Sequence, residues 1–212
     1  MTADQQPRYE YRIWADKFGF LKDELQRLAR EVVPDQVSEE VYVLSGATDD
    51  CNAKIRGGRL NIKSRIATEH RLELWEPVLD AEFPLDRSVI AGQIFPCLEV
   101  GAPNLRRARY SIENFREIIQ PQHQLAIVPA RKRRTRFRLA DCLGEFTSVV
   151  VGKINLETIA LESIKAHSVL RLMDQLQIAD RPNTSYVRQL KEILTGNPGT
   201  ASRLSRKMPK SD

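Results

Sequence analysis

The chain has 212 residues, 42% of them hydrophobic and 29% charged, which is the composition of an ordinary globular protein. This length favours one domain over two, and no apolar run reaches the ~20 residues that a membrane-spanning helix needs. The first twenty residues lack the apolar stretch of a secretory signal, so we expect a cytoplasmic protein that does not enter membranes. The net charge of +5 favours a polyanionic partner, and part of it lies in residues 197–212, an expected flexible basic tail.

The first half of the chain contains several stretches in which apolar and charged residues alternate. In the first of them, Tyr11 and Ile13 share one face of a predicted strand, and Glu10 and Arg12 lie on the other. The patterns predict a strand at 8–14, a helix at 16–32 before Pro34, a strand at 41–44, a hairpin over 52–66 that turns at Gly57-Gly58, and a strand at 70–75.

The second half mixes helical and strand patterns, so the fold class is α+β. Residues 84–120 are predicted to be largely helical, with Ser111 as the N-cap of their last helix. Strands are predicted at 124–128, 131–139, 145–151 and 157–163, followed by helices at 165–177 and 184–195. Asn183 or Thr184 is the expected N-cap of the final helix, which ends at Gly196.

The three cysteines, Cys51, Cys97 and Cys142, are odd in number and far apart. Their spacing predicts neither a disulfide framework nor a CxxC zinc or redox site. A reducing cytoplasm suits them, and Cys51 is expected to be a small buried thiol.

Charges of both signs recur on successive predicted strands. The cations are Lys54, Arg56, Lys63, Lys132 and Arg134, and the carboxylates are Glu10, Glu73, Glu145 and Glu162. Inside a barrel, such cations could hold phosphate oxygens and the carboxylates could hold Mg²⁺ or Mn²⁺. An antiparallel strand with one face in water is charged on that face too, and alternation alone favours this second interpretation.

Other functions have less support in the sequence. Residues 131–138 are rich in arginine, which is typical of binding to nucleic-acid backbones, but only Phe137 is available there for stacking on bases. The three histidines lack the spacing of metal ligands, and no nucleotide-binding GxxxxGK[ST] or GxGxxG motif is present.

Four blocks resemble the CYTH domain family, also called triphosphate tunnel metalloenzymes. They are YEYRIW (9–14), NAKIRGGRLNIKSR (52–65), KRRTRFRLADCLGEFTSVVV (132–151) and IALESIKAHSVLRLMDQLQIADRPNTSYVRQL (159–190). Glu10 and Arg12 match the second Glu and the basic position of the family's E-x-E-x-K strand. Glu162 matches the second acid of its terminal E-x-E. Two acidic positions are lost, because Arg8 and Ala160 occupy them.

The resemblance implies a closed eight-stranded antiparallel β-barrel, a tunnel with helices packed outside, formed by one domain over residues 8–196. It places phosphate-binding residues at Arg12, Lys54, Arg56, Lys63, Lys132 and Arg134, and metal ligands for Mg²⁺ or Mn²⁺ at Glu10, Glu73, Glu145 and Glu162. It assigns no catalytic residue.

Two hypotheses follow from the resemblance and its departures. One is a metal-dependent phosphohydrolase that acts on a triphosphate or polyphosphate compound. The other is a noncatalytic module that binds polyphosphate or a nucleotide, since the loss of two acids weakens metal binding more than phosphate binding. Either protein is expected to be a monomer or a homodimer.

Overall fold

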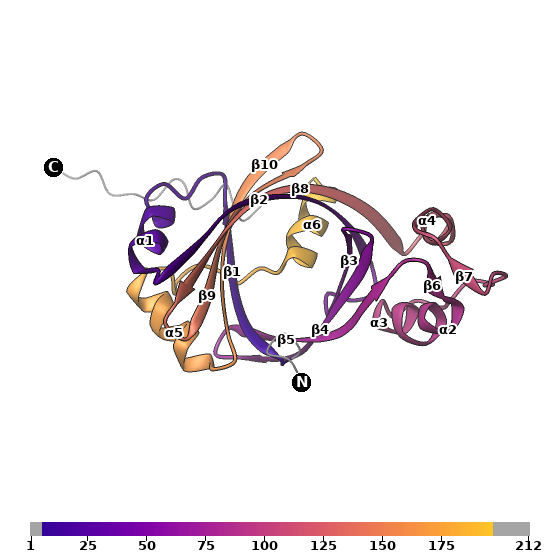
Figure 1. Cartoon of the computed structure of the whole chain (residues 1–212), viewed down its shortest axis with the longest axis horizontal. Coiled ribbons are helices and arrows are strands. Elements are labelled where there is room, and N and C mark those ends of the chain that lie inside the picture. The colour runs from indigo at the N-terminus through magenta and orange to yellow at the C-terminus, as the bar shows by residue number, and fades with distance from the viewer. Residues whose placement is uncertain (1–5, 197–212) are drawn as a thin grey trace.

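The computed structural model describes residues 6–196, and its centre is a closed antiparallel barrel of eight strands (Figure 1). The strand order is β1-β10-β9-β8-β2-β3-β4-β5, and β5 pairs with β1 to close the ring. The strands are β1 (Arg8–Ala15), β2 (Glu31–Ser45), β3 (Cys51–Arg56), β4 (Arg59–Glu69), β5 (Leu72–Glu82), β8 (Leu125–Leu139), β9 (Cys142–Val151) and β10 (Ile154–Ser163). The predicted fold class, an α+β barrel with helices outside, is confirmed.

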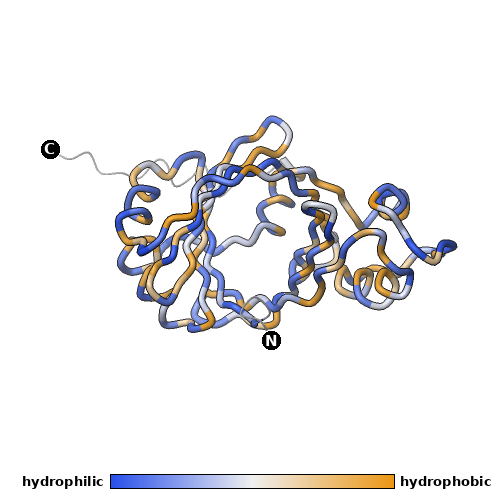
Figure 2. Tube along the Cα trace, in the orientation of Figure 1, coloured by the Kyte–Doolittle hydropathy of each residue, from blue (hydrophilic) through white to orange (hydrophobic). Residues whose placement is uncertain are grey.

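Alternation along the strands separates the outer face from the interior, and polar and apolar residues accordingly alternate along the trace in Figure 2. On β1, Tyr11 and Ile13 point outward into a hydrophobic cluster. Helices α1 (Leu21–Leu28) and α5 (Ala166–Gln175) cover this cluster with buried residues such as Leu25 and Val169. Two short amphipathic helices therefore shield one side of the barrel from water.

A second unit covers the outer face of β3 and β4 and projects from the barrel in Figure 1. It contains β6 (Leu85–Asp86), α2 (Arg87–Val89), the π-helical η1 (Ile90–Ile94), α3 (Phe95–Cys97), β7 (Arg109–Tyr110) and α4 (Ile112–Ile119). The prediction of helix over 84–120 is correct for its two ends only. Residues 98–108, between α3 and β7, are irregular, and Pro103 among them cannot donate a helical hydrogen bond. Ser111 caps α4 as predicted.

Helix α6 (Tyr186–Leu194) lies within the outline of the barrel in Figure 1 and fills one end of it. Its Tyr186, Val187 and Leu190 pack in one cluster with inward-facing residues of β1, β2, β8, β9 and β10, among them Trp14 and Tyr42. Its N-cap is Ser185, whose hydroxyl accepts from the Arg188 amide, and not Asn183 or Thr184 as predicted. The interior is therefore apolar at the α6 end and polar elsewhere.

Several predicted boundaries are wrong. The helix predicted at 16–32 is shorter in the structure, where it is α1. The strand expected at 41–44 is longer, because β2 begins at Glu31. The two strands predicted around Pro129 are one strand, β8. Long pairing between β2 and β8 explains both differences, because a bulge between Val33 and Gln36 accommodates Pro34 in the ladder.

The prediction of unpaired cysteines is also wrong. Cys51 of β3 and Cys97 of α3 form a disulfide with a Cα–Cα distance of 5.6 Å, whereas Cys142 is a free buried thiol. The two cysteines are 46 residues apart in the sequence, and they meet because the second unit packs against β3. Among the described helices, none is long and apolar enough to cross a membrane. The predicted basic tail at 197–212 lies outside the described residues.

Candidate functional site

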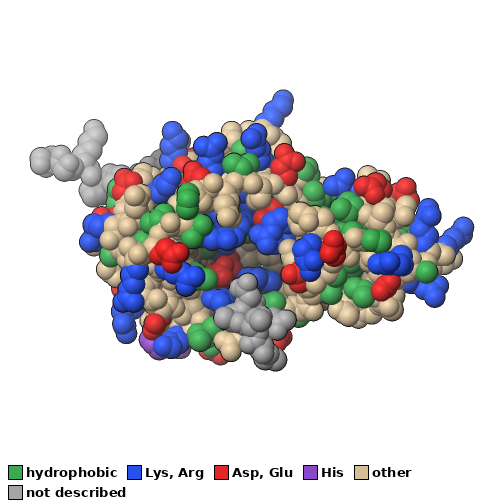
Figure 3. Space-filling model, in the orientation of Figure 1, with side chains coloured by type: hydrophobic (Ala, Val, Ile, Leu, Met, Phe, Trp, Pro, Cys, Tyr) green, Lys and Arg blue, Asp and Glu red, His purple; other side chains and the backbone are tan. Residues whose placement is uncertain are grey.

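The register of the barrel brings the predicted site residues to its inner face. Glu10 lies directly opposite Glu162 of β10 on one side and Glu73 of β5 on the other. Lys132 and Arg134 lie two residues apart on β8, which β9 separates from β10. Figure 3 shows the mouth of the barrel as a hollow with both basic and acidic side chains around it. These residues therefore share one interior, as the resemblance implied, and do not form the water-exposed strand faces that alternation alone favoured.

A buried carboxylate that the sequence analysis missed, Glu40 of β2, organises the basic residues. Lys132 Nζ lies 2.8 Å from Glu40 Oε2, and Arg134 Nη2 lies 3.1 Å from Oε1. Lys54 Nζ and Arg56 Nη1 approach the same carboxylate at 3.6 Å each. We call these five residues the Glu40 cluster. Four of the six predicted phosphate-binding residues therefore converge on one carboxylate.

The inner part of the Glu40 cluster is closed to water. Glu40 has 0% exposure and Lys132 has 1%. The Lys132 ammonium also donates to Tyr42 Oη and lies 3.6 Å from the centre of the Tyr186 ring on α6. Burial and the nearby Lys54 lower the pKa of Lys132 well below its ordinary value. Burial opposes the charge of Glu40, but Lys54, Lys132 and Arg134 outweigh it and hold its pKa well below the usual range.

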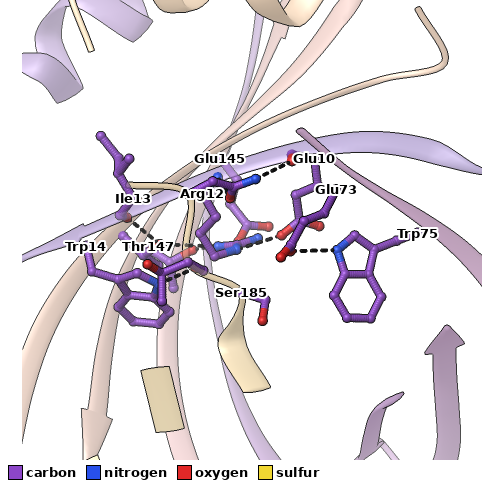
Figure 4. A network of polar contacts seen from close by, with 12 residues as sticks. Glu10, Arg12, Ile13, Trp14, Glu73, Trp75, Glu145, Thr147 and Ser185 are labelled. Atoms are coloured by element: carbon purple, nitrogen blue, oxygen red, sulfur yellow. Dashed lines mark hydrogen bonds and ion pairs between the residues drawn. The ribbon is translucent and has the colours of Figure 1, made fainter. Parts of the chain in front are cut away.

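A second network links Arg12 to two carboxylates (Figure 4). Arg12 Nε donates to Glu10 Oε1 at 2.8 Å, and Nη1 lies 3.6 Å from Glu145 Oε1. Arg134 Nε lies 2.9 Å from the other oxygen of Glu145, an ion pair without hydrogen-bond geometry. Burial alone would raise the pKa of Glu145, but Arg134 and Arg12 lower it to about 2. Arg134 connects this network to the Glu40 cluster.

Glu73 is held separately, by residues that the sequence analysis did not single out. Its carboxylate accepts hydrogen bonds from Arg65 Nη1 at 3.1 Å and from Arg188 of α6. It also accepts one from Trp75 Nε1 at 3.1 Å (Figure 4). Burial nevertheless raises the pKa of Glu73 above its ordinary value. This carboxylate ties α6 to the barrel wall.

Glu162 and Lys63 are less constrained. Among the described residues, neither side chain takes part in a salt bridge, although each affects the charge of the other. Burial raises the pKa of Glu162 against the opposing charge of Lys63, and Glu10 and Glu145 raise it further. Glu162 raises the pKa of Lys63. Both side chains are therefore available to an incoming ligand.

The four predicted metal ligands do not form a common cage. Within residues 6–196, no three His, Cys, Asp or Glu side chains gather in a way that could hold a metal ion. Glu10, Glu73 and Glu145 are each turned toward an arginine. The directly opposed pair Glu10 and Glu162 is the arrangement that fits Mg²⁺, which commonly uses one or two carboxylates and takes its other ligands from substrate phosphates and water.

A cavity of about 470 Å³ opens at the mouth beside the Glu40 cluster. Arg56 and Arg134 line it together with Gln36, Ser38 and Arg136. Gln36 and Ser38 come from the part of β2 for which no helix or strand was predicted. Because only residues 41–44 were expected to form this strand, the inward positions of Gln36, Ser38 and Glu40 could not be recognised.

The sequence N-T-S-Y at residues 183–186, just before and at the start of α6, closes a gap in the barrel wall. Strands β1 and β5 pair only through Arg8, Tyr9 and Glu10 of β1. Beyond that point, Asn183 Oδ1 accepts from the Arg12 amide, and Asn183 Nδ2 donates to the carbonyl of Glu10 and to that of Arg71. The motif therefore seals the wall and places Tyr186 inside.

No protein-family model matches the sequence, and no curated protein is a significant match. Similar solved structures do exist. The PH1012 protein of Pyrococcus horikoshii OT3 is 14% identical, with a TM-score of 0.53, over 85% of this chain and 97% of its own. A conserved hypothetical protein of Pyrococcus furiosus is 15% identical, also with a TM-score of 0.53, over 85% and 98% of the two chains.

A third structure, of the HpAC1 protein from Hippeastrum, is described as revealing a dominant triphosphatase activity. It is 14% identical with a TM-score of 0.49, and covers 90% of this chain and 96% of its own. At these identities the two Pyrococcus structures, each with a TM-score of 0.53, show the fold alone. The eight-stranded antiparallel tunnel that the resemblance to the CYTH domain implied is the fold of this chain.

Proposed function

We propose that the mouth of the barrel binds the phosphate groups of a triphosphate or polyphosphate compound. Arg56 and Arg134 line the cavity at the mouth, and a guanidinium group offers paired donors that match phosphate oxygens. Arg12 and Lys63 add positive charge around Glu10. Lys54 and Lys132 raise the positive potential further inside.

The excess of cations over carboxylates on the inner face of the barrel carries this proposal. The inward-facing acids are Glu10, Glu40, Glu73, Glu145 and Glu162, and the cations that act on them are Arg12, Lys54, Arg56, Lys63, Arg65, Lys132, Arg134 and Arg188. Like charges buried near one another are unfavourable unless an opposite charge shares the site. A polyanion in the cavity supplies that charge.

The first test is calorimetric titration of the protein with inorganic triphosphate in the presence of EDTA. Arg56→Gln and Lys63→Gln are each expected to weaken binding about tenfold or more, because each removes a charge-assisted interaction worth about 1.5–3 kcal/mol. Arg133→Gln is the matched control, since Arg133 lies on β8 with its side chain exposed on the outer face.

Two outcomes of this titration contradict the proposal. Unchanged affinity in both interior variants removes the tunnel as the binding site. An equal loss in the Arg133 variant, with steep salt dependence, places the anion on the outer arginines and favours the binding of a nucleic-acid backbone.

A second candidate function, metal-dependent hydrolysis of the bound compound, is favoured by the direct opposition of Glu10 and Glu162. These two residues would hold Mg²⁺ or Mn²⁺ jointly with the ligand, and the ion would supply Lewis-acid activation of the terminal phosphate. The residues of the chain itself would orient the phosphates through Arg56 and Arg134.

Phosphate release from inorganic triphosphate, ATP and thiamine triphosphate tests this candidate, with Mg²⁺, Mn²⁺ or EDTA. Release that requires the metal and falls at least a hundredfold in Glu162→Gln is the expected result. The same variant is expected to bind triphosphate in EDTA as tightly as the natural chain or more tightly, because it removes a negative charge beside Lys63. Binding without release under any condition contradicts hydrolysis and leaves the binding function.

A further inference from the structure

The environment of Glu40 is that of a bound phosphate group. Two ammonium and two guanidinium groups surround its carboxylate, at 2.8 Å for Lys132, 3.1 Å for Arg134 and 3.6 Å for both Lys54 and Arg56. Arginine and lysine groups arranged in this way are typical of sites that bind phosphate oxygens. The position is filled by the chain's own carboxylate.

Glu40 also separates the cavity from the innermost cations. Arg56 and Arg134 line the cavity, and both contact Glu40 Oε1. The other oxygen, Oε2, contacts Lys132 and Tyr42, which pack against Tyr186 of α6. The order from the mouth inward is therefore the cavity, the two arginines, Glu40, Lys132 and the Tyr186 ring.

Arg56 retains donors for a ligand despite its contact with Glu40, and Arg134, which is 7% exposed and also faces Glu145, lines the same cavity. Arg56 has 39% of its side chain exposed, and a guanidinium group has five donors. A phosphate that rests on these arginines reaches the carboxylate of Glu40 next. A second phosphate placed further inside would meet a full negative charge in a water-excluded site, where repulsion is strong.

We propose that Glu40 limits the length of the phosphate tail that the tunnel accepts. It does so by occupying the position that the innermost phosphate of a longer tail would take. This inference rests on the proposed binding function and adds to it a residue that determines specificity. It applies whether the bound compound is hydrolysed or not.

The test compares the affinities for inorganic pyrophosphate, triphosphate and tetraphosphate, each measured by calorimetry in EDTA. Glu40→Gln keeps the shape of the side chain and removes its charge. The affinity for tetraphosphate relative to pyrophosphate is expected to rise at least tenfold in this variant. Glu39→Gln is the matched control: it removes the same charge from the adjacent residue of β2, whose side chain is exposed, and its ratio is expected to stay that of the natural chain.

A second variant keeps the test decisive if Glu40→Gln alone does not fold. Glu40→Gln combined with Lys132→Met removes the buried ion pair as a unit, a change that proteins often tolerate without loss of stability. Lys54, Arg56 and Arg134 remain, so the ratio is again expected to rise.

An unchanged or lower ratio in whichever of these variants folds overturns the inference while the proposed function stands. If neither the natural chain nor any variant binds any of the three phosphates, the proposed function and this inference both fail. The two failures are therefore distinguishable in one set of titrations.

Discussion

Glu145 lies between two guanidinium groups, and its ionisation is therefore coupled to folding. Arg134 and Arg12 lower its pKa to about 2, against about 4.3 for an unfolded glutamate. A depressed carboxyl pKa contributes stability that is complete above the unfolded value and is lost as the pH falls toward the folded value. The gap corresponds to about 3 kcal/mol at neutral pH.

We therefore expect Glu145→Gln to lower the free energy of unfolding at pH 7 by about 2–3 kcal/mol. We also expect the stability of this variant to fall less between pH 4.5 and pH 2 than that of the natural chain, because its unfolding takes up one proton fewer in this pH range. Urea denaturation at a series of pH values measures both effects. Glu39→Gln, on the exposed face of β2, is the control and is expected to follow the natural curve. Parallel curves of stability against pH for Glu145→Gln and the natural chain would contradict a lowered pKa of Glu145 in the folded protein.

At the scale of elements, α6 has two roles that its sequence pattern does not separate. Its apolar stripe fills one end of the barrel, and its Arg188 reaches Glu73 on β5. The preceding Asn183 bridges β1 to the chain at Arg71, where the direct pairing of β1 with β5 has ended. A helix of nine residues is marginal on its own in water, so its packing in the barrel supplies most of the stability of α6.

Leu190→Ala tests the packing of α6. Leu190 has 0% exposure in the cluster that fills the barrel end, so the cavity left by its side chain is expected to cost about 2–5 kcal/mol of stability. Leu194→Ala is the matched control on the same helix: this side chain is 52% exposed, and the expected change is within about 0.5 kcal/mol. Urea denaturation measures both variants, and similar costs would show that α6 is not packed inside the barrel.

For the whole molecule, the closed barrel was predictable from the order of the four blocks that resemble the CYTH domain, whereas alternation alone predicted only strands. Alternation put Glu10 with Arg12 on one strand face and Lys132 with Arg134 on another, and the resemblance assigned both faces to the interior. Glu40 was missed because it lay just outside the short strand expected at 41–44, and only the pairing with β8 extends that strand. The disulfide was missed for a related reason, since the contact between Cys51 and Cys97 depends on how the second unit packs.

The filled end at α6 also bears on how a long polymer would meet this protein. With Tyr186, Val187 and Leu190 packed into one end, a linear chain cannot thread through the barrel, and whatever enters by the mouth also leaves by it. On the proposed function, only the termini of a polyphosphate chain can be bound. The number of binding positions in a polyphosphate sample then depends on its number of chain ends and not on its total number of phosphate units. Cutting a long polymer into short pieces therefore multiplies the positions that the protein can bind.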